Sequence, residues 1–558
     1  AGQGWYDLRQ YRLDPALGGF DIHWSRLVDL PIAGLILLLR PFIGPEAAEK
    51  WACGLTPLLP LTVTMTGLSL TIRRLVAPMA WPLGLVILIF ACTSTILMYA
   101  PMRVDHHGWQ LACLALTVAG LADPRRVRGG GTVGLSSALS LTIGLELLPY
   151  CAMAGAILAL RWVWDGSDAA RLRIYGLTLA GGSALGFALF ASTDNQAMRC
   201  DALTPVWLSV TVAAGALLFA LSLLRAGSLW LRLALAALAG GVIAGGFAGL
   251  FPHCLQRPEG VSDELARTWL NNVREARPIY KHAFKTGFPI AVLPVIGLVG
   301  AVVATWRARR STAAIGWAAI ALFTAFAGAM LLWQLRAGPA AQLLSVPGAV
   351  ALLWILLPWF LSRGSMLLRV FGSVAAFLLV SGLFAGLVLP YLPSNTSGKP
   401  GKSAGADRSA KANAACGRTS SLRPLNRYPT ATIFTQVDMG PRLIAITHHN
   451  GVAGPYHRNG DAILDVHHAF TGPARGFRPI AARHQATLLL VCDDMAETTV
   501  YRARNANGFY GQLRRGQVPH WLEPMTLPKG SPFRLWRIRY DLAEISAPPL
   551  PVRRPARP

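Results

Sequence analysis

Charged residues are scarce in this 558-residue chain. They make up 14% of it, against 53% hydrophobic residues, and the mean hydropathy is +0.42. A soluble protein of this length carries more charge, so the composition excludes an ordinary soluble enzyme. Apolar runs of about 17 to 24 residues recur along the chain and match the thickness of a bilayer core. The sequence therefore predicts a polytopic membrane protein.

Acidic residues are especially few, 27 against 52 Lys and Arg, which gives a net charge of +25. Such an excess can indicate nucleic-acid binding. In a membrane protein, however, basic residues gather in cytoplasmic loops, which accounts for much of it. The eight cysteines form no Cys-x-x-Cys motif, which excludes a zinc module of that type. We also find no internal repeats.

Twelve apolar segments follow a polar first loop. Residues 29–45 precede them and are apolar but short, which predicts a helix that lies in or re-enters the interface. The chain begins without Met or an apolar leader, so we expect a first membrane helix to be missing from this numbering. The segments, with ends set to within a few residues, are 53–72, 80–100, 108–122, 134–148, 149–164, 173–192, 204–224, 228–251, 286–305, 312–335, 341–361 and 367–390.

Arginines fall in every second connection between these segments. By the positive-inside rule, the connections that carry them are cytoplasmic. The outer connections then include residues 1–52, 100–108, 252–285 and everything after about 391, and all of the candidate chemistry lies there. The sorting arginines are Arg73, Arg74, Arg125, Arg126, Arg128, Arg161, Arg171, Arg173, Arg225, Arg232, Arg307, Arg309, Arg310, Arg363 and Arg369.

The composition changes after the last apolar segment, so we expect residues 1–390 to form the membrane domain. Residues 391–415 are rich in Gly, Ser, Lys and Ala, which predicts a flexible linker. Residues 416–548 are more polar and contain the β-branched runs ATIFTQV, RLIAIT, TLLLVC and FRLWRIR, which predict a small outer α/β domain. The Pro/Arg-rich tail 549–558 is expected to be disordered.

An extracytoplasmic location permits disulfides. Cys416 and Cys492 both lie in the predicted outer domain, and Cys200 and Cys254 both lie in predicted outer loops, so we expect these two pairs. The other cysteines lie in or beside apolar segments and are expected to pack there. They are Cys53, Cys92, Cys113 and Cys151.

The segment YAPMRVDHHGWQ at 99–110 places one Asp and two His between two apolar runs. Ionisable groups at the mouth of a membrane bundle are costly without partners, which points to a functional site. Asp105 and His107 can present a carboxylate and an imidazole to one cation. His106 would support a ligand or face the acceptor, since adjacent side chains point apart. The alternative is a polar turn between two helices.

Other polar motifs lie on the predicted outer side. The first loop contains GWYDLRQYR and DIHWSR, the long loop contains NVREARP, and WQLR precedes a late apolar segment. The outer domain contains TQVDMGP and GPYHRN. These motifs occupy residues 4–12, 21–26, 272–278, 333–336, 435–441 and 454–459.

Taken in order, these motifs resemble the catalytic subunit of oligosaccharyltransferase, in a divergent bacterial-type form. That family consists of polytopic glycosyltransferases of the GT-C class. The resemblance covers most of the chain and rests on the order and side of five weak motifs. It implies a mostly α-helical GT-C membrane domain with one helix more than the twelve segments found here, catalytic outer loops, and a C-terminal extracytoplasmic domain.

The resemblance implies that Asp7, Asp105 and Glu275 are catalytic. Asp7, Asp105 and His107 would bind a divalent cation, Mg²⁺ or Mn²⁺, and the imidazole favours Mn²⁺. Glu275 would orient or deprotonate the acceptor, or complete the metal shell. As alternatives, Asp7 is a surface Asp that pairs with a nearby Arg of the first loop, and Glu275 pairs with Arg274 or Arg277.

The resemblance also suggests residues that bind substrate. Arg336 would bind the phosphates of a lipid-linked donor through its guanidinium; the alternative is an Arg that extends to the interface. Asp438 matches the Asp of the family's WWDYG motif, in which only the Asp and Gly remain here. Because the paired Trp and the Tyr are absent, the acceptor stays open between protein, lipid and polysaccharide.

Several further outer residues are candidates without a family counterpart. Glu146 has no balancing charge nearby in sequence, so it would contact sugar or pair helices. The remaining candidates would line the donor pocket or a cleft facing the membrane, and a structural role in loops and turns is the alternative. They are Trp24, Arg26, Tyr456, His457 and Arg458, with Asp21 and His23 beside the first two.

The sequence thus predicts a multi-pass enzyme of the inner (plasma) membrane that uses a polyprenyl-(pyro)phosphate-linked sugar donor. Its active site and C-terminal domain would be periplasmic, and no nucleic-acid partner is expected. One alternative is a GT-C transferase that uses a polyprenyl-monophosphate sugar to modify a lipid or cell-wall polymer. Another is a transporter or scaffold, which the one-sided charges and the absence of repeated halves disfavour.

Overall fold

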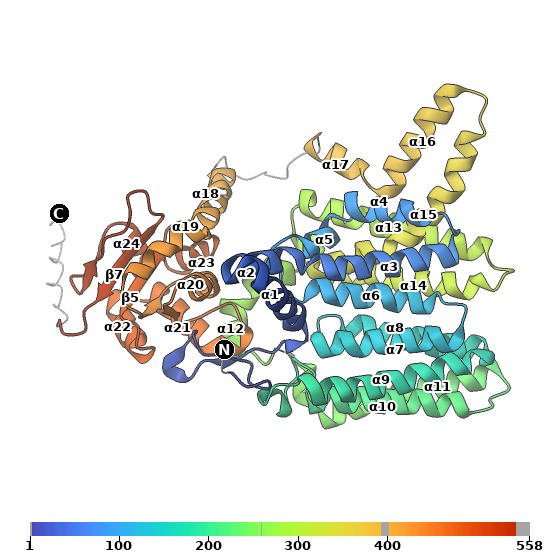
Figure 1. Cartoon of the computed structure of the whole chain (residues 1–558), viewed down its shortest axis with the longest axis horizontal. Helices are drawn as coiled ribbons and strands as arrows, with labels where there is room; N and C mark the ends of the chain where they lie inside the picture. The colour runs from blue at the N-terminus through green and yellow to red at the C-terminus, as the bar shows by residue number, and fades with distance from the viewer. Residues whose placement is uncertain (1–2, 258, 392–400, 543–558) are drawn as a thin grey trace, which may run out of the picture. The chain divides into compact units, whose positions relative to one another are not determined.

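The computed structural model describes residues 3–257, 259–391 and 401–542. The chain divides into two compact units (Figure 1). Unit 1 comprises residues 1–8, 23–260 and 273–397, and unit 2 comprises residues 9–22, 261–272 and 398–558. Residues 9–22 and 261–272, which we expected within the membrane domain, therefore belong to unit 2. Their short elements pair and pack with that unit, which hydropathy alone does not reveal.

Unit 1 is built almost entirely of helices, and each of the twelve predicted segments lies mainly in one or two of them. The predicted interfacial helix at 29–45 is α1. The helices are α1 (Asp29–Ile43), α2 (Pro45–Leu55), α3 (Leu58–Leu75), α4 (Trp81–Phe90), α5 (Thr93–Ile96), α6 (His107–Leu121), α7 (Arg126–Ile143), α8 (Leu148–Trp164), α9 (Ala169–Phe190), α10 (Pro205–Leu223), α11 (Leu229–Leu250), α13 (Phe284–Arg307), α14 (Ala313–Met330), α15 (Gly338–Leu361), α16 (Met366–Ser381) and α17 (Phe384–Val388).

Within the described residues, seven helices are long and apolar enough to cross a membrane, or up to nine if each of two bent pairs is one span. The bends measure 76° between α4 and residues 93–99, and 90° between α16 and residues 384–391. We expected both segments to be continuous. Gly382 follows α16 with φ of +79°, a backbone conformation that ends a helix and that glycine adopts without strain. Twelve membrane crossings remain a prediction.

Close packing between α9 and α10 depends on two small residues. A Cβ added to Gly176 would lie 2.5 Å from the carbonyl oxygen of Gly215, and one added to Gly215 would lie 2.5 Å from that of Gly176. Small residues at helix crossings let backbones approach closely in a membrane bundle. This contact explains why both positions are glycine.

The carboxyl end of α6 is surrounded by arginines from three other helices. Arg74, Arg161 and Arg171 donate hydrogen bonds to the carbonyls of Ala119, Leu121 and Gly120, at 2.6, 2.9 and 3.0 Å. The last carbonyls of a helix have no partner within it and carry partial negative charge. The arginines therefore satisfy this helix end.

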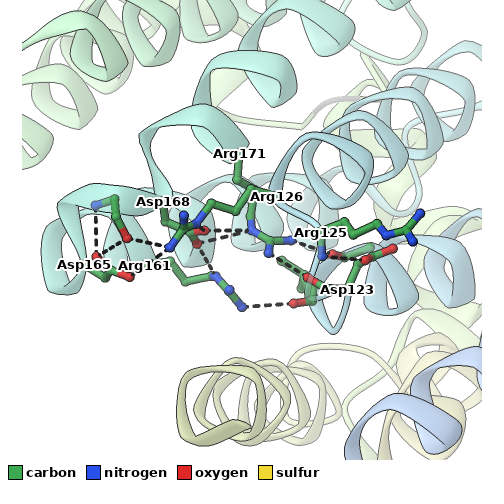
Figure 2. Close-up of polar contacts among 10 residues, drawn as sticks. Asp123, Arg125, Arg126, Arg161, Asp165, Asp168 and Arg171 are labelled. Atoms are coloured by element: carbon green, nitrogen blue, oxygen red, sulfur yellow. Dashed lines mark hydrogen bonds and ion pairs between the residues drawn. The ribbon is translucent and has the colours of Figure 1, made fainter. Parts of the chain in front are cut away.

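Two aspartates balance these arginines (Figure 2). Asp123 accepts ion pairs from Arg74 at 2.8 Å and Arg128 at 2.6 Å. Asp168 accepts them from Arg161 at 2.8 Å and Arg171 at 3.2 Å. All four arginines were assigned to one side of the membrane by the positive-inside rule, and the structure gathers them into one network.

Both expected disulfides are formed. Cys200 pairs with Cys254 in unit 1, and Cys416 pairs with Cys492 in unit 2. Their Cα atoms lie 5.4 and 6.4 Å apart, within the usual range for this bond. The remaining four cysteines are free, and three of them are buried.

Unit 2 is an α/β unit with a five-stranded mixed sheet in the order β4-β3-β5-β7-β6. The central strand β5 is buried along its whole length and is parallel to β3 but antiparallel to β7, with Leu490 opposite Leu535. The strands are β3 (Thr432–Phe434), β4 (Asn450–Gly451), β5 (Leu488–Cys492), β6 (Leu522–Pro524) and β7 (Phe533–Ile538). A separate hairpin joins β1 (Arg9–Gln10) and β2 (Phe20–Asp21).

The helices of unit 2 include two segments predicted otherwise. The expected flexible linker is helical from Gly401 to Cys416 (α18), because its Ala, Lys and Arg residues are strong helix formers. The run RLIAIT lies mostly in α20 (Gly440–Ile446), which Pro441 helps to start. Residues 392–400 of the linker and the tail 549–558 lie outside the described residues. The other helices are α12 (Asp263–Thr268), α19 (Thr419–Leu422), α21 (Gly460–Thr471), α22 (Ala474–Arg483), α23 (Ala496–Arg504) and α24 (Phe509–Arg514).

A buried histidine links residues 9–22 to the rest of unit 2. His484 is fully buried, and its Nδ1 lies 2.7 Å from Asp14 while its Nε2 lies 2.9 Å from Asp465. Burial alone would lower the pKa of His484. Its hydrogen bonds to the two carboxylates and their charges outweigh burial and raise the pKa to about 9.

Because the pKa of His484 rises from 6.5 to about 9 on folding, its contribution to stability is complete below pH 6.5 and is lost between pH 6.5 and 9. The contribution amounts to at most about 3 kcal/mol. We expect H484Q to lower the unfolding temperature of unit 2 clearly at pH 6 but much less at pH 9.5. Thermal unfolding of the full chain in detergent measures this. As a control, H468Q removes an exposed histidine–glutamate pair and should change little at either pH.

Candidate functional site

A polar cluster lies at the end of α6 opposite the arginine network. Its centre is Glu146, in the turn between α7 and α8, whose side chain is 19% exposed. The carboxylate accepts hydrogen bonds from His106 Nε2 at 2.8 Å, Gln110 Nε2 at 3.0 Å and Trp24 Nε1 at 3.2 Å. Glu146 therefore connects the first loop, α6 and the α7–α8 turn, which fits helix pairing better than contact with sugar.

Aromatic and imidazole rings form a continuous stack beside Glu146. The ring centroids are 4.4 Å apart for His23 and Trp24, 4.7 Å for Trp24 and His106, and 4.2 Å for His106 and His107. Burial alone would raise the pKa of Glu146, but the charge and hydrogen bond of His106 and the charges of His23 and His107 hold it well below its usual range. The carboxylate thus stays ionised among imidazoles.

A pocket opens next to the stack. Within the described part of the chain, the hydroxyl of Ser25 is buried there without a hydrogen-bond partner. The pocket offers hydroxyl, amide and imidazole groups but no carboxylate. Its lining residues are His23, Ser25, Thr142, Ile143, Gly144, Gly186, Phe190, Ala191, Asn195 and Leu203.

Asp105 lies just before α6 and is held by its neighbours. It accepts from Arg103 Nε at 2.7 Å and from the His107 backbone N–H at 3.1 Å, and its carboxylate is 3.2 Å from His107 Nδ1. Partial burial opposes ionisation, but the hydrogen bond and charge of His107 and those of Arg103 lower the pKa of Asp105 to about 2. Asp105 and His107 are therefore brought together as predicted, with Arg103 as an unforeseen third member.

The first loop is fixed by Arg26. Its guanidinium donates to the backbone carbonyls of Trp5 at 2.6 Å, of Gly4 at 3.0 Å and of Asp7. Trp5 in turn donates to the carbonyl of Leu189 at 2.7 Å. Arg26 thus anchors the segment that carries Asp7, which favours the structural role over donor binding.

The predicted metal ligands do not meet in this arrangement. Among the described residues, one group of three side chains places its ligand atoms within 4.8 Å of one another, and it consists of Cys200, His253 and Cys254. Asp7 does not complete such a group with Asp105 and His107, and Asp105 instead pairs with Arg103. The donor types suit Mn²⁺ or Mg²⁺, but their arrangement does not fit a bound cation, so metal binding remains a prediction.

Glu275 and Arg336 lie on neighbouring segments of unit 1. The short helix η8 (Arg274–Ala276) packs against η10 (Leu335–Ala337). Beside them, the N–H of Leu335 donates to the carbonyl of Arg277 at 2.8 Å, and the N–H of Ile279 donates to Leu331 at 3.0 Å. Glu275 and Arg336, 61 positions apart in sequence, thereby lie on segments that are held side by side.

Both side chains remain available. In the described residues, Glu275 is exposed and forms no ion pair, so the alternative pairing with Arg274 or Arg277 is not seen. The Nε of Arg336 is buried and has no hydrogen-bond acceptor in the same part of the chain. A buried guanidinium nitrogen without an acceptor is costly, and an anionic ligand would satisfy it.

In unit 2, the predicted substrate-binding residues divide into two kinds. Arg458 forms a buried ion pair with Asp21 at 3.1 Å, and the ring of Tyr456 packs on Phe20 at 5.2 Å, contacts that favour the structural alternative. His457 is half-buried beside them. Asp438, by contrast, presents an exposed side chain.

The backbone of Asp438 is held by a buried glutamate. The N–H groups of Val437 and Asp438 donate to Glu497 at 2.9 and 2.8 Å, and Tyr501 also donates to that carboxylate. Burial, with the charge of Asp438 beside it, raises the pKa of Glu497 to about 8. Glu497 therefore fixes the loop that presents Asp438.

Three residues of these sites were not predicted from the sequence. Gln110 lies one helical turn after His106, and Arg103 lies two residues before Asp105, so a search for polar neighbours in the same segment would have found them. Glu497 is about 60 residues from Asp438, and nothing local in the sequence connects the two.

No family model and no curated protein matches this chain. Solved structures of the oligosaccharyltransferase from Archaeoglobus fulgidus do. The structure of that protein, AglB, with an inhibitory peptide and a dolichol-phosphate has a TM-score of 0.62 at 13% identity, covering 97% of this chain and 68% of that one. The structure tethered through a disulfide to an acceptor peptide with an NVT sequon has a TM-score of 0.64 at 13% identity, covering 96% and 68%. The complex with Zn and sulfate has a TM-score of 0.60 at 13% identity, covering 88% and 62%.

These similarities establish the fold at low sequence identity. The chain has the fold of an archaeal oligosaccharyltransferase over most of its length and spans about two thirds of the length of those proteins. The resemblance expected from the sequence motifs is confirmed at the level of fold.

Proposed function

We propose that this protein is a membrane glycosyltransferase of the oligosaccharyltransferase type. It transfers a sugar or oligosaccharide from a polyprenyl-(pyro)phosphate carrier to an acceptor on the extracytoplasmic side of the plasma membrane. The observation that carries the proposal is the pairing of η8 with η10, which places the free carboxylate of Glu275 and the guanidinium of Arg336 on adjacent segments. The shared fold supports it.

The two side chains have separate roles in the proposed reaction. Arg336 donates hydrogen bonds to a phosphate of the carrier and stabilises the charge that grows as the bond from sugar to phosphate breaks. Glu275 orients the attacking group of the acceptor and accepts its proton. Since the arrangement of Asp7, Asp105 and His107 does not fit a bound cation, no step of the proposed transfer is assigned to a metal.

The proposed carrier and acceptor are based on the molecules that similar structures contain. One similar structure contains a dolichol-phosphate, and another contains an acceptor peptide with an NVT sequon. These contents support a polyprenyl-linked donor for this chain. Its acceptor is a protein, a lipid or a polysaccharide, because Asp438 lacks the Trp and Tyr neighbours of the family motif.

Arg336 provides the direct test. We expect R336M to lower the rate of transfer from a polyprenyl-linked donor about 10- to 100-fold, the value of one or two charge-assisted hydrogen bonds. R336K should recover only part of it, because lysine cannot bind phosphate bidentately. The substrates are first identified by mass spectrometry of glycolipids and glycoproteins from cells with and without the gene. An R336M protein as active as the wild type would contradict the role of Arg336.

The same assay separates the alternatives. Donors with one or two phosphates, offered in parallel, distinguish a polyprenyl-monophosphate transferase from a pyrophosphate-dependent one. A glycan profile unchanged by removal of the gene would favour the transporter or scaffold instead.

A further inference from the structure

Helix α7 begins with three exposed arginines. Residues 124–128 read Pro-Arg-Arg-Val-Arg, and all five are exposed. The helix starts at Arg126, its N-cap Arg125 supplies no side-chain hydrogen bond, and its first turn contains no acidic residue. The first N–H groups of a helix have no partner within it and carry partial positive charge. The arginines add to this charge, so the start of α7 favours a bound anion.

The nearby carboxylates do not neutralise this charge. Asp123 accepts from Arg128 Nε at 2.6 Å and Nη2 at 3.0 Å, but it also pairs with an arginine of α3 at 2.8 Å. Arg126 lies 3.7 Å from Asp165 and 3.3 Å from Asp168. Asp168 in turn pairs with two further arginines (Figure 2). Positive charge therefore remains in excess at this end of the bundle.

An exposed apolar face continues along α7 from these arginines. Val127, Leu135 and Leu139 are 58%, 56% and 41% exposed. Their spacing of eight and four residues places them on one face of the helix. Helix α7 packs along α9, which belongs to a segment long and apolar enough to cross a membrane. A cationic end followed by an apolar face matches an amphiphile with an anionic head.

We propose that the start of α7 binds the phosphate of an anionic phospholipid, whose acyl chain lies along this exposed face. Arg125 is the principal contact, because its guanidinium forms no ion pair or hydrogen bond within the described residues. Arg126 and Arg128 supply further positive charge. Arginine binds phosphate through charge-assisted, bidentate hydrogen bonds, and basic groups at membrane helix ends attract anionic lipids.

The surrounding charge also selects among lipids. A choline headgroup would bring a second cation next to the arginines, whereas glycerol brings none. We therefore expect phosphatidylglycerol to bind in preference to phosphatidylcholine. The inference does not rest on the proposed transfer reaction, because none of these residues belongs to the candidate site.

The loop after α13 offers a matched comparison on the same predicted side of the membrane. Arg309 packs over the ring of Trp306 at 4.1 Å and donates to its carbonyl at 2.9 Å. Arg310 is exposed beside it. These arginines follow the carboxyl end of a helix, where partial negative charge stabilises cations. They should therefore bind lipid phosphate more weakly than the start of α7 does.

Native mass spectrometry of the purified full chain, titrated with phosphatidylglycerol or phosphatidylcholine of the same acyl chains, tests the proposal. We expect the wild type to bind one phosphatidylglycerol at least about tenfold more tightly than phosphatidylcholine. R125Q/R126Q should lower the affinity for phosphatidylglycerol about 10- to 30-fold, since each arginine near a membrane surface contributes about fivefold. R309Q/R310Q is the control and should bind as the wild type does.

Three results would overturn the inference. They are equal phosphatidylglycerol binding by R125Q/R126Q and wild type, an equal loss in R309Q/R310Q, and equal affinity of the wild type for the two lipids. Displacement of the lipid by inorganic phosphate at the same concentration would also contradict it, because the apolar face would then contribute nothing. Should R125Q/R126Q fail to fold, R125Q alone decides, since it removes no contact within the described residues.

Discussion

Replacing Glu275 with glutamine is expected to slow glycosyl transfer by about 10²- to 10⁴-fold, the usual contribution of a general base. Glutamine keeps the shape of the side chain but cannot accept a proton. The carboxylate is exposed and forms no ion pair in the described residues, so the change should leave the fold intact. Initial rates with saturating lipid-linked donor and varied acceptor measure the effect, and unchanged thermal unfolding confirms that the protein is folded.

Glu264 offers a matched control for that experiment. It is exposed and pairs with His468 at 2.6 Å in unit 2, so E264Q should transfer sugar at the wild-type rate. E275D should recover part of the activity, because a shorter carboxylate still accepts a proton. If Asp105→Ala and Glu275→Ala together left transfer unaffected, the proposed function itself would be wrong.

The largest loss of stability is expected from Asp168. Its carboxylate is 7% exposed and pairs with Arg161 and with Arg171, whose side chain is 2% exposed (Figure 2). D168N removes the charge and leaves a buried guanidinium without its counter-ion. Breaking a buried ion pair on one side costs about 3–5 kcal/mol. We expect a matching fall in the free energy of unfolding, measured by denaturant titration of the full chain in detergent.

An exposed pair of the same chemistry gives the comparison. Glu46 and Lys50 lie 3.1 Å apart with side chains 72% and 64% exposed, so E46Q should cost about 0.5 kcal/mol or less. Adding R171M to D168N should restore part of the lost stability, because it removes the uncompensated charge. A D168N protein as stable as E46Q would show that Asp168 does not hold this end of the bundle.

Much of the fold could be predicted from sequence because it depends on local patterns. Apolar runs identified the helices of unit 1, and β-branched runs identified β3, β5 and β7. The pairs Cys200–Cys254 and Cys416–Cys492 were predicted because the first two lie in predicted outer loops and the last two in the predicted outer domain, and both pairs are formed. Prediction failed where two local signals competed. In α18, the polar and glycine residues indicated a flexible linker, although the same segment contains many strong helix formers.

The candidate site was only partly predictable. Asp105 and His107 are two residues apart, so their proximity follows from sequence, as does the position of Glu275 in a long connection between apolar helices. The partners of charged residues do not follow. Arg26 binds backbone carbonyls, and Arg458 pairs with Asp21, 437 residues away, and no local pattern in the sequence indicates either contact.

By itself, then, the sequence determined the class of protein, the apolar helices, the α/β unit and the fold family, since hydropathy, charge sorting and motif order are properties of short stretches. Tertiary structure alone decided that Glu146 accepts from His106, that Arg458 pairs with Asp21, and that Glu275 lies beside the Arg336 segment. The physical reason is the short range of polar interactions. Ion pairs and hydrogen bonds act over about 3 Å, and which groups come that close depends on how turns and helix crossings bring distant segments together.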